Sequence, residues 1–149
     1  STQTTLEFND YGISFSAFNS AYNPRIDNQY KENLQPQVHQ VSAISIDSYI
    51  QETNCVPDFI KIDAESAEYD ILIGMSELLR TNKPYISLEV GDMGIQGVAK
   101  SKQLIASLID KGYNAFEYKE GRIVKHIIQE EYICNNIFFI HPDMDSNVI

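Results

Sequence analysis

Two carboxylates, Asp63 and Glu65, are the side chains in this sequence most able to do chemistry. They directly follow a short apolar run, residues 59–62, which is interrupted only by Lys61. A carboxylate at such a place can accept the proton of a substrate hydroxyl, or Asp63 can help to hold a divalent metal that orients the hydroxyl. A structural role stays open, because Asp63 can cap the next helix and Glu65 can interact favourably with its N-terminus.

The residues around this pair change from a strand period to a helical period. The run before Asp63 is typical of a strand that is buried on both faces of a parallel sheet. The apolar residues after it recur at helical spacing and predict one amphipathic helix that ends near residues 80–82; they are Ala67, Ile71, Leu72, Met75, Leu78 and Leu79. Ligands of open α/β sheets bind outside the carboxyl ends of the strands, where Asp63 and Glu65 would lie.

A second buried strand is predicted at residues 85–90 and contains Glu89. Side chains alternate between the two faces of a strand, so Lys61 shares a face with Asp63. If the two strands pair in parallel, Lys61 lies near Glu89. An ammonium group in a buried strand needs a partner, because an unpaired buried charge is costly. We therefore expect an ion pair between Lys61 and either Glu89 or Asp63, and its role can be structural or catalytic.

The same segment resembles the core motif of the FkbM-type S-adenosylmethionine-dependent methyltransferases. That motif has a helix start with Asp-Ser, a strand that reads Asp-hydrophobic-hydrophobic-Lys-Ile-Asp, then Val-Glu-Gly-Ala-Glu and hydrophobic-Leu-x-Gly. The matching segments occur here in the same order and spacing; they are SIDS at 45–48, DFIKID at 58–63, AESAE at 64–68 and ILIG at 71–74. Ser66 stands where the family has glycine.

The resemblance covers residues 4–141 and implies an α/β fold. The expected architecture is the C-terminal portion of a Rossmann-like methyltransferase sheet, with parallel strands, flanking helices and a terminal antiparallel strand at 136–141. The Gly-rich turn and the acidic residue with which such enzymes hold the cofactor are absent from their usual context. We therefore expect one partial domain, 1–149, without the cofactor-binding half. Its cofactor-binding residues are unknown, and alone it should bind S-adenosylmethionine weakly or not at all.

The function implied by the resemblance is O-methylation of a hydroxyl on a sugar or small metabolite. Asp63 and Glu65 are then the expected catalytic residues, with Lys61 and Glu89 beside them. Two alternatives remain: a non-catalytic binding module that uses the aromatic residues of 13–37, and a structural domain that self-associates through an exposed sheet edge to form a homo-oligomer. A long surface loop is the simpler interpretation of 13–37.

The other predicted elements are short and separated by turn residues. Residues 91–97 contain three glycines and predict a mobile loop rather than a phosphate cradle, and 142–149 predict a frayed tail. Further strands are expected at 4–8, 38–44, 113–118 and 123–127, the last two as a hairpin, and further helices from Ser45 to about Asn54 and over 100–111, before Gly112.

Composition excludes several classes of function. The 149 residues carry a net charge of −10, which argues against binding to nucleic acid or to an anionic membrane. The sequence has no apolar run long enough for a membrane span and no signal peptide, so we expect a cytoplasmic protein or an engineered start. Cys55 and Cys134 predict buried or half-buried free thiols, and three scattered histidines predict no zinc site.

Overall fold

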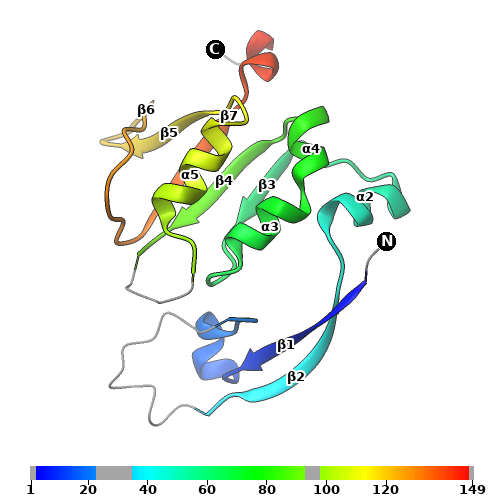
Figure 1. Cartoon of the computed structure of the whole chain (residues 1–149). Coiled ribbons are helices and arrows are strands. Elements are labelled where there is room, and N and C mark those ends of the chain that lie inside the picture. Colours follow the sequence, from blue (N-terminus) through cyan, green and yellow to red (C-terminus); the bar gives the residue numbers. More distant parts are fainter. Residues whose placement is uncertain (1–2, 23–34, 93–97, 148–149) are drawn as a thin grey trace.

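The computed structural model of the chain describes residues 3–22, 35–92 and 98–147. It is an α/β structure with a five-stranded mixed sheet in the order β3-β4-β7-β5-β6 and a separate two-stranded sheet of β1 and β2 (Figure 1). The strands are β1 Thr4–Asp10, β2 Gln37–Ala43, β3 Phe59–Ile62, β4 Tyr85–Val90, β5 Asn114–Lys119, β6 Arg122–Lys125 and β7 Asn135–Ile140. The helices are η1 Ile13–Phe18, α2 Ile46–Thr53, α3 Glu68–Gly74, α4 Ser76–Thr81, α5 Ser101–Ile109 and η2 Pro142–Asn147.

The strand directions confirm the two predictions that matter most for the site. β3 and β4 pair in parallel, with Lys61 opposite Ser87. β7 is antiparallel to both of its neighbours, β4 and β5, as expected of the terminal strand. The predicted hairpin is β5 and β6, and its two turn residues, Glu120 and Gly121, have φ of 51° and 80°. A two-residue turn with positive φ at both positions matches the twist of a hairpin.

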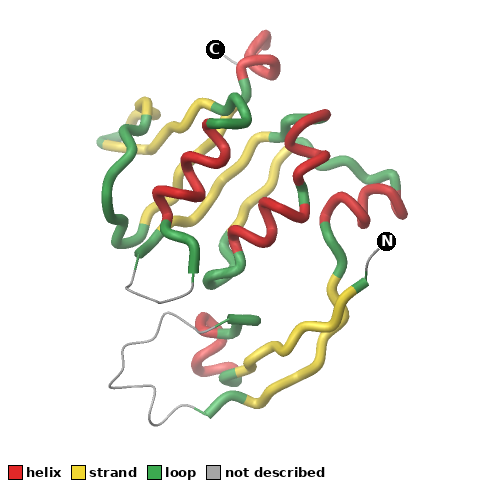
Figure 2. Tube along the Cα trace, viewed as in Figure 1, coloured by secondary structure: helices red, strands yellow, loops and turns green. Residues whose placement is uncertain are grey.

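The helices α3, α4 and α5 lie over the same face of the five-stranded sheet (Figure 2). The core forms between them and the alternate residues of β4 and β7, which are fully buried; these are Ile86, Leu88, Val90, Ile137 and Phe139. The expectation that β3 is buried on both faces is wrong, since Phe59 and the side chain of Lys61 are each 56% exposed. β3 is the edge strand of the sheet, and its alternate residues Ile60 and Ile62, not Phe59 and Lys61, pack into the core.

The single helix predicted after Asp63 is broken into α3 and α4 at Met75, where φ is −120°. The side chain of Asp47, in the first turn of α2, accepts hydrogen bonds from the amides of Glu77 and Leu78 at 2.9 and 3.0 Å. Asp47 therefore caps α4 across the structure. A Cβ on Gly74 would lie 3.3 Å from that of Ser45, so the glycine permits α2 to approach the break closely.

Other differences from the expected elements are local. The expected loop 13–37 begins with the 3-10 helix η1, and most of its remainder, 23–34, lies outside the described residues. The same holds for 93–97 in the glycine-containing loop. The expected frayed tail contains η2. Neither Cys55 nor Cys134 forms a disulfide among the described residues, and both are exposed rather than buried or half-buried.

Among the described residues, no helix combines the length and the apolar character needed to cross a membrane.

Tyr113, which precedes β5, should make the fold less stable at high pH. Its side chain is 2% exposed, and its hydroxyl has no hydrogen-bond partner among the described residues. Burial raises the pKa of Tyr113 to about 12, from an ordinary value of 10.0. The folded state therefore holds the proton more tightly than the unfolded state, so this contribution to stability is complete below about pH 10 and falls by about 1.4 kcal/mol per pH unit up to about pH 12.

The substitution Tyr113→Phe should remove that part of the decline. Urea unfolding followed by circular dichroism between about pH 9 and pH 11.5 measures the slope of the unfolding free energy. Tyr118→Phe is the matched control, because Tyr118 is 66% exposed and should leave the slope unchanged. An identical slope in wild type and Tyr113→Phe would contradict the assignment.

Candidate active site

The turn between β3 and α3 positions the two carboxylates predicted from the sequence. Its backbone takes a positive φ at two consecutive residues, 44° at Glu65 and 83° at Ser66. The amide of Ala67 then donates to the carbonyl oxygen of Ala64 at 3.1 Å. Consecutive left-handed residues reverse the chain in a short distance. Asp63 does not cap α3, because the N-cap position is Ala67 and no side chain bonds there.

Glu68 holds this turn in place. It is 1% exposed, and its Oε1 atom accepts hydrogen bonds from the amides of Ala64 and Ser66 at 3.2 and 3.3 Å. In the sequence, Glu68 stands out only as the last residue of the AESAE segment, 64–68. Its position, four residues before Leu72 on the apolar stripe of the helix, was the signal that it would be buried, and a buried carboxylate needs donors.

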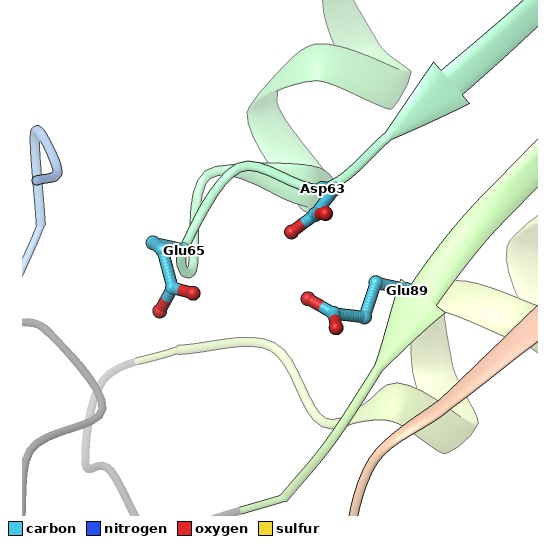
Figure 3. Close-up of side chains that lie close together, drawn as sticks. All are labelled: Asp63, Glu65 and Glu89. Carbon is cyan, nitrogen blue, oxygen red and sulfur yellow. The ribbon is translucent and has the colours of Figure 1, made fainter. Parts of the chain in front are cut away.

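Three carboxylates meet at the carboxyl ends of the two parallel strands. Asp63 follows β3, Glu65 lies in the turn, and Glu89 belongs to β4 (Figure 3). Each offers one oxygen, and these oxygens all lie within 4.8 Å of one another. Asp63 is exposed, whereas Glu65 and Glu89 are half-buried. The structure thus brings together all three acidic residues that the sequence singled out.

Lys61 pairs with Asp63, one of the two partners expected for it. Its Nζ atom lies 2.7 Å from the Oδ2 atom of Asp63. The hydrogen bond and the charge of Asp63 are the main causes that raise the pKa of Lys61, and the charge of Glu89 adds to them. Both side chains of the pair are exposed, so the ion pair adds little to stability.

The donor set of this cluster suits a hard divalent cation. Mg²⁺ and Ca²⁺ prefer carboxylate oxygens, and Asp63, Glu65 and Glu89 would be the residues to hold one. Cys134 adds a thiol beside this cluster, with its Sγ atom 3.4 Å from Oε1 of Glu89. No spacing in the sequence signals this neighbour, because it depends on the pairing of β4 with β7.

A pocket of about 960 Å³ opens beside the carboxylates. Its volume lies at the upper end of the range of about 300–1,000 Å³ that is usual for small-molecule sites. Asp63, Glu65 and Glu89 line one side, and residues of β1, β2 and the segment around η1 line the other. The sequence predicts β1 and β2 as strands but gives no sign that they close a pocket over the βα turn.

Comparison with known protein families decides which family contains this arrangement. The model of the methyltransferase FkbM domain matches residues 8–115, which is more than half of the chain. The chain belongs to the FkbM methyltransferase family. The match includes the turn and both strands that carry the three carboxylates. Searches of curated proteins and of solved structures found no match to the chain.

Ser66 stands where the FkbM motif has glycine, and its backbone conformation explains the family's glycine. A φ of 83° is strained for a residue with a side chain but not for glycine. The Ser66 hydroxyl is also buried and has no hydrogen-bond partner among the described residues. Ser66→Gly should therefore raise the free energy of unfolding by about 1 kcal/mol and Tm by about 3 °C, after the entropy lost to glycine is included.

Thermal and urea unfolding of the Ser66→Gly variant measure this gain. Ser107→Gly is the matched control, because Ser107 lies within α5, where glycine should cost about 1 kcal/mol. If Ser66→Gly were destabilised as much as Ser107→Gly, strain at position 66 would be refuted.

Proposed function

We propose that this chain acts in an S-adenosylmethionine-dependent methyltransferase that O-methylates a hydroxyl of a sugar or small metabolite. The observation that carries the proposal is the convergence of Asp63, Glu65 and Glu89 beside a large pocket in a chain of the FkbM family. The carboxyl ends of parallel strands are the usual ligand site of α/β sheets.

The arrangement of the sheet supports a Rossmann-like assignment. β3 and β4 are parallel neighbours connected through α3 and α4, and the antiparallel β7 lies between β4 and β5. A terminal antiparallel strand of this kind is what the FkbM resemblance implies.

In the proposed reaction the protein supplies proton transfer and orientation. S-adenosylmethionine contributes an electrophilic methyl group on a sulfonium cation, and the acidic side of the pocket suits that charge. Asp63 or Glu65 accepts the proton of the substrate hydroxyl as its oxygen forms the new bond to the methyl carbon and the carbon–sulfur bond breaks. The ammonium of Lys61 lies beside Asp63 and balances the charge of that carboxylate, and Glu89 lies close enough to help orient the proton acceptor.

Transfer of an isotope-labelled methyl group tests the proposal. The chain, and the full natural gene product that contains it, would be incubated with labelled S-adenosylmethionine and a panel of sugars and hydroxylated metabolites. Label in an ether methyl group of a product is the expected result. Label on nitrogen or carbon atoms only would show that the acceptor is not a hydroxyl, and no label in any product of the full gene product would count against methyl transfer.

A further inference from the structure

The pocket beside the carboxylates has two walls, and only one of them carries charged side chains. One wall is a single face of the two-stranded sheet of β1 and β2. Leu6 lies opposite Val41 in the register of the two strands, and Thr4 lies opposite Ala43. These four residues and Phe8 all line the pocket, as the two-residue period of a strand requires. This wall is mostly apolar, and its side chains are exposed or only half-buried, so they are available to a ligand.

The facing wall carries all the carboxylates of the pocket, beside small and apolar residues of the βα turn and of α3. Asp63, Glu65, Glu89 and Asp70 line it, and the described lining residues include no lysine, arginine or histidine. Three of these carboxylates lie within 4.8 Å of one another. The ammonium of Lys61 offsets one of these negative charges, but the carboxylates outnumber it. This wall therefore disfavours an anionic group and favours cations and hydrogen-bond donors.

Hydrogen bonds fix the two walls relative to each other. Ser20, which follows η1, donates from its hydroxyl to the carbonyl oxygen of Glu65 at 2.6 Å and forms a β-bridge with Asn9 of β1. The hydroxyl of Tyr22 donates to the carboxylate of Asp70. The segment after η1 therefore links the two-stranded sheet to the βα turn. The pocket is thus preformed.

We propose that this pocket selects an acceptor substrate with an apolar body and a head group that donates hydrogen bonds and carries no negative charge. The body packs on Leu6, Phe8 and Val41, and the head lies against the carboxylates. Phosphorylated and carboxylated molecules are rejected. Only the role of the ligand as methyl acceptor rests on the proposed function; the binding preference rests on the two walls.

Binding of simple probes tests the preference without any turnover. The chain, labelled with ¹⁵N, is titrated with n-hexyl β-D-glucoside, with its butyl homologue, with free glucose and with n-hexyl phosphate, and Kd is read from amide shifts. The hexyl glucoside should bind and should shift signals on both walls. Each methylene that is buried should tighten Kd by about fourfold, so the butyl homologue, which is two methylenes shorter, should bind about 16-fold more weakly.

The anionic probe distinguishes selection by charge from nonspecific apolar binding. n-Hexyl phosphate has the same alkyl chain, so a purely apolar site would bind it as well as the glucoside. We expect no binding at concentrations that saturate the chain with hexyl glucoside. Equal affinity for the two hexyl probes would overturn the proposal, and so would the absence of any binding by hexyl glucoside.

A pair of substitutions on β2 tests whether the ligand binds against the apolar wall of the pocket. Val41→Asn puts a polar group on the apolar wall and should weaken hexyl glucoside binding about tenfold. Val38→Asn is the matched control, since Val38 lies on the same strand, is 54% exposed and does not line the pocket. Equal losses in the two variants would overturn the assignment. Because the alkyl series uses the wild-type chain, it tests the proposal even if Val41→Asn does not fold.

The outcome is separable from that of the proposed function. Binding of hexyl glucoside without methyl transfer to any hydroxyl would support the binding preference and contradict the proposed methyl transfer. Methyl transfer to a phosphorylated acceptor would support the methyl transfer and contradict the binding preference.

Discussion

Asp63→Asn should lower kcat/KM for methyl transfer by about 10²- to 10⁴-fold, the usual loss when a general base is removed. The amide keeps the shape of the side chain but cannot accept the hydroxyl proton. The fold should survive, because the ion pair that is lost, with Lys61, joins two exposed side chains. Initial rates with labelled S-adenosylmethionine measure the effect, and circular dichroism verifies the fold.

The matched control is Asp58→Asn at the other end of the same strand. Asp58 is exposed, precedes β3 and does not belong to the carboxylate cluster. Its variant should keep the wild-type rate. Glu65→Gln, made in parallel, identifies the proton acceptor, because the acceptor should show the larger loss. Wild-type rates for both Asp63→Asn and Glu65→Gln would show that neither carboxylate takes part in the reaction.

Glu68→Ala should lower the free energy of unfolding by about 3 kcal/mol, the largest effect on stability that we expect for a single polar substitution here. The change leaves the amides of Ala64 and Ser66 without the acceptor that now satisfies them in a buried turn. Two lost acceptor contacts at about 1–3 kcal/mol each give this magnitude. Urea unfolding followed by circular dichroism measures it, since the chain has no tryptophan.

Two further variants separate the role of Glu68 from a general effect of removing a glutamate. Glu68→Gln retains an acceptor oxygen and should lose only about 1 kcal/mol. Glu52→Ala, at an exposed position of α2, should change stability by less than about 0.5 kcal/mol. A loss from Glu68→Ala no larger than that from Glu52→Ala would show that the carboxylate does not hold the turn.

The sequence predicts the site well where local pattern decides the structure. The βα unit around Asp63 follows from a change of period within residues 59–79. Glu89 joins Asp63 and Glu65 because parallel strands present their carboxyl ends at the same edge of a sheet, and the order of the two strands is enough to anticipate it.

The sequence does not predict features of the structure that depend on contacts with a distant part of the chain. The break between α3 and α4 depends on Asp47, thirty residues earlier in the chain, whose carboxylate caps α4. The exposure of Lys61 depends on β3 being an edge strand, and periodicity cannot distinguish an edge strand from a central one. The apolar wall of the pocket depends on the pairing of β1 with β2, which are separated by 26 residues in the chain.

The central claim, that the chain is part of a methyltransferase, is tested most directly by calorimetric titration of S-adenosylhomocysteine into the chain and into the full natural gene product that contains it. We expect saturable one-to-one binding by the full gene product, unchanged by Asp63→Asn, because Asp63 is assigned to proton transfer rather than to the cofactor. No heat of binding from the full gene product would contradict the claim.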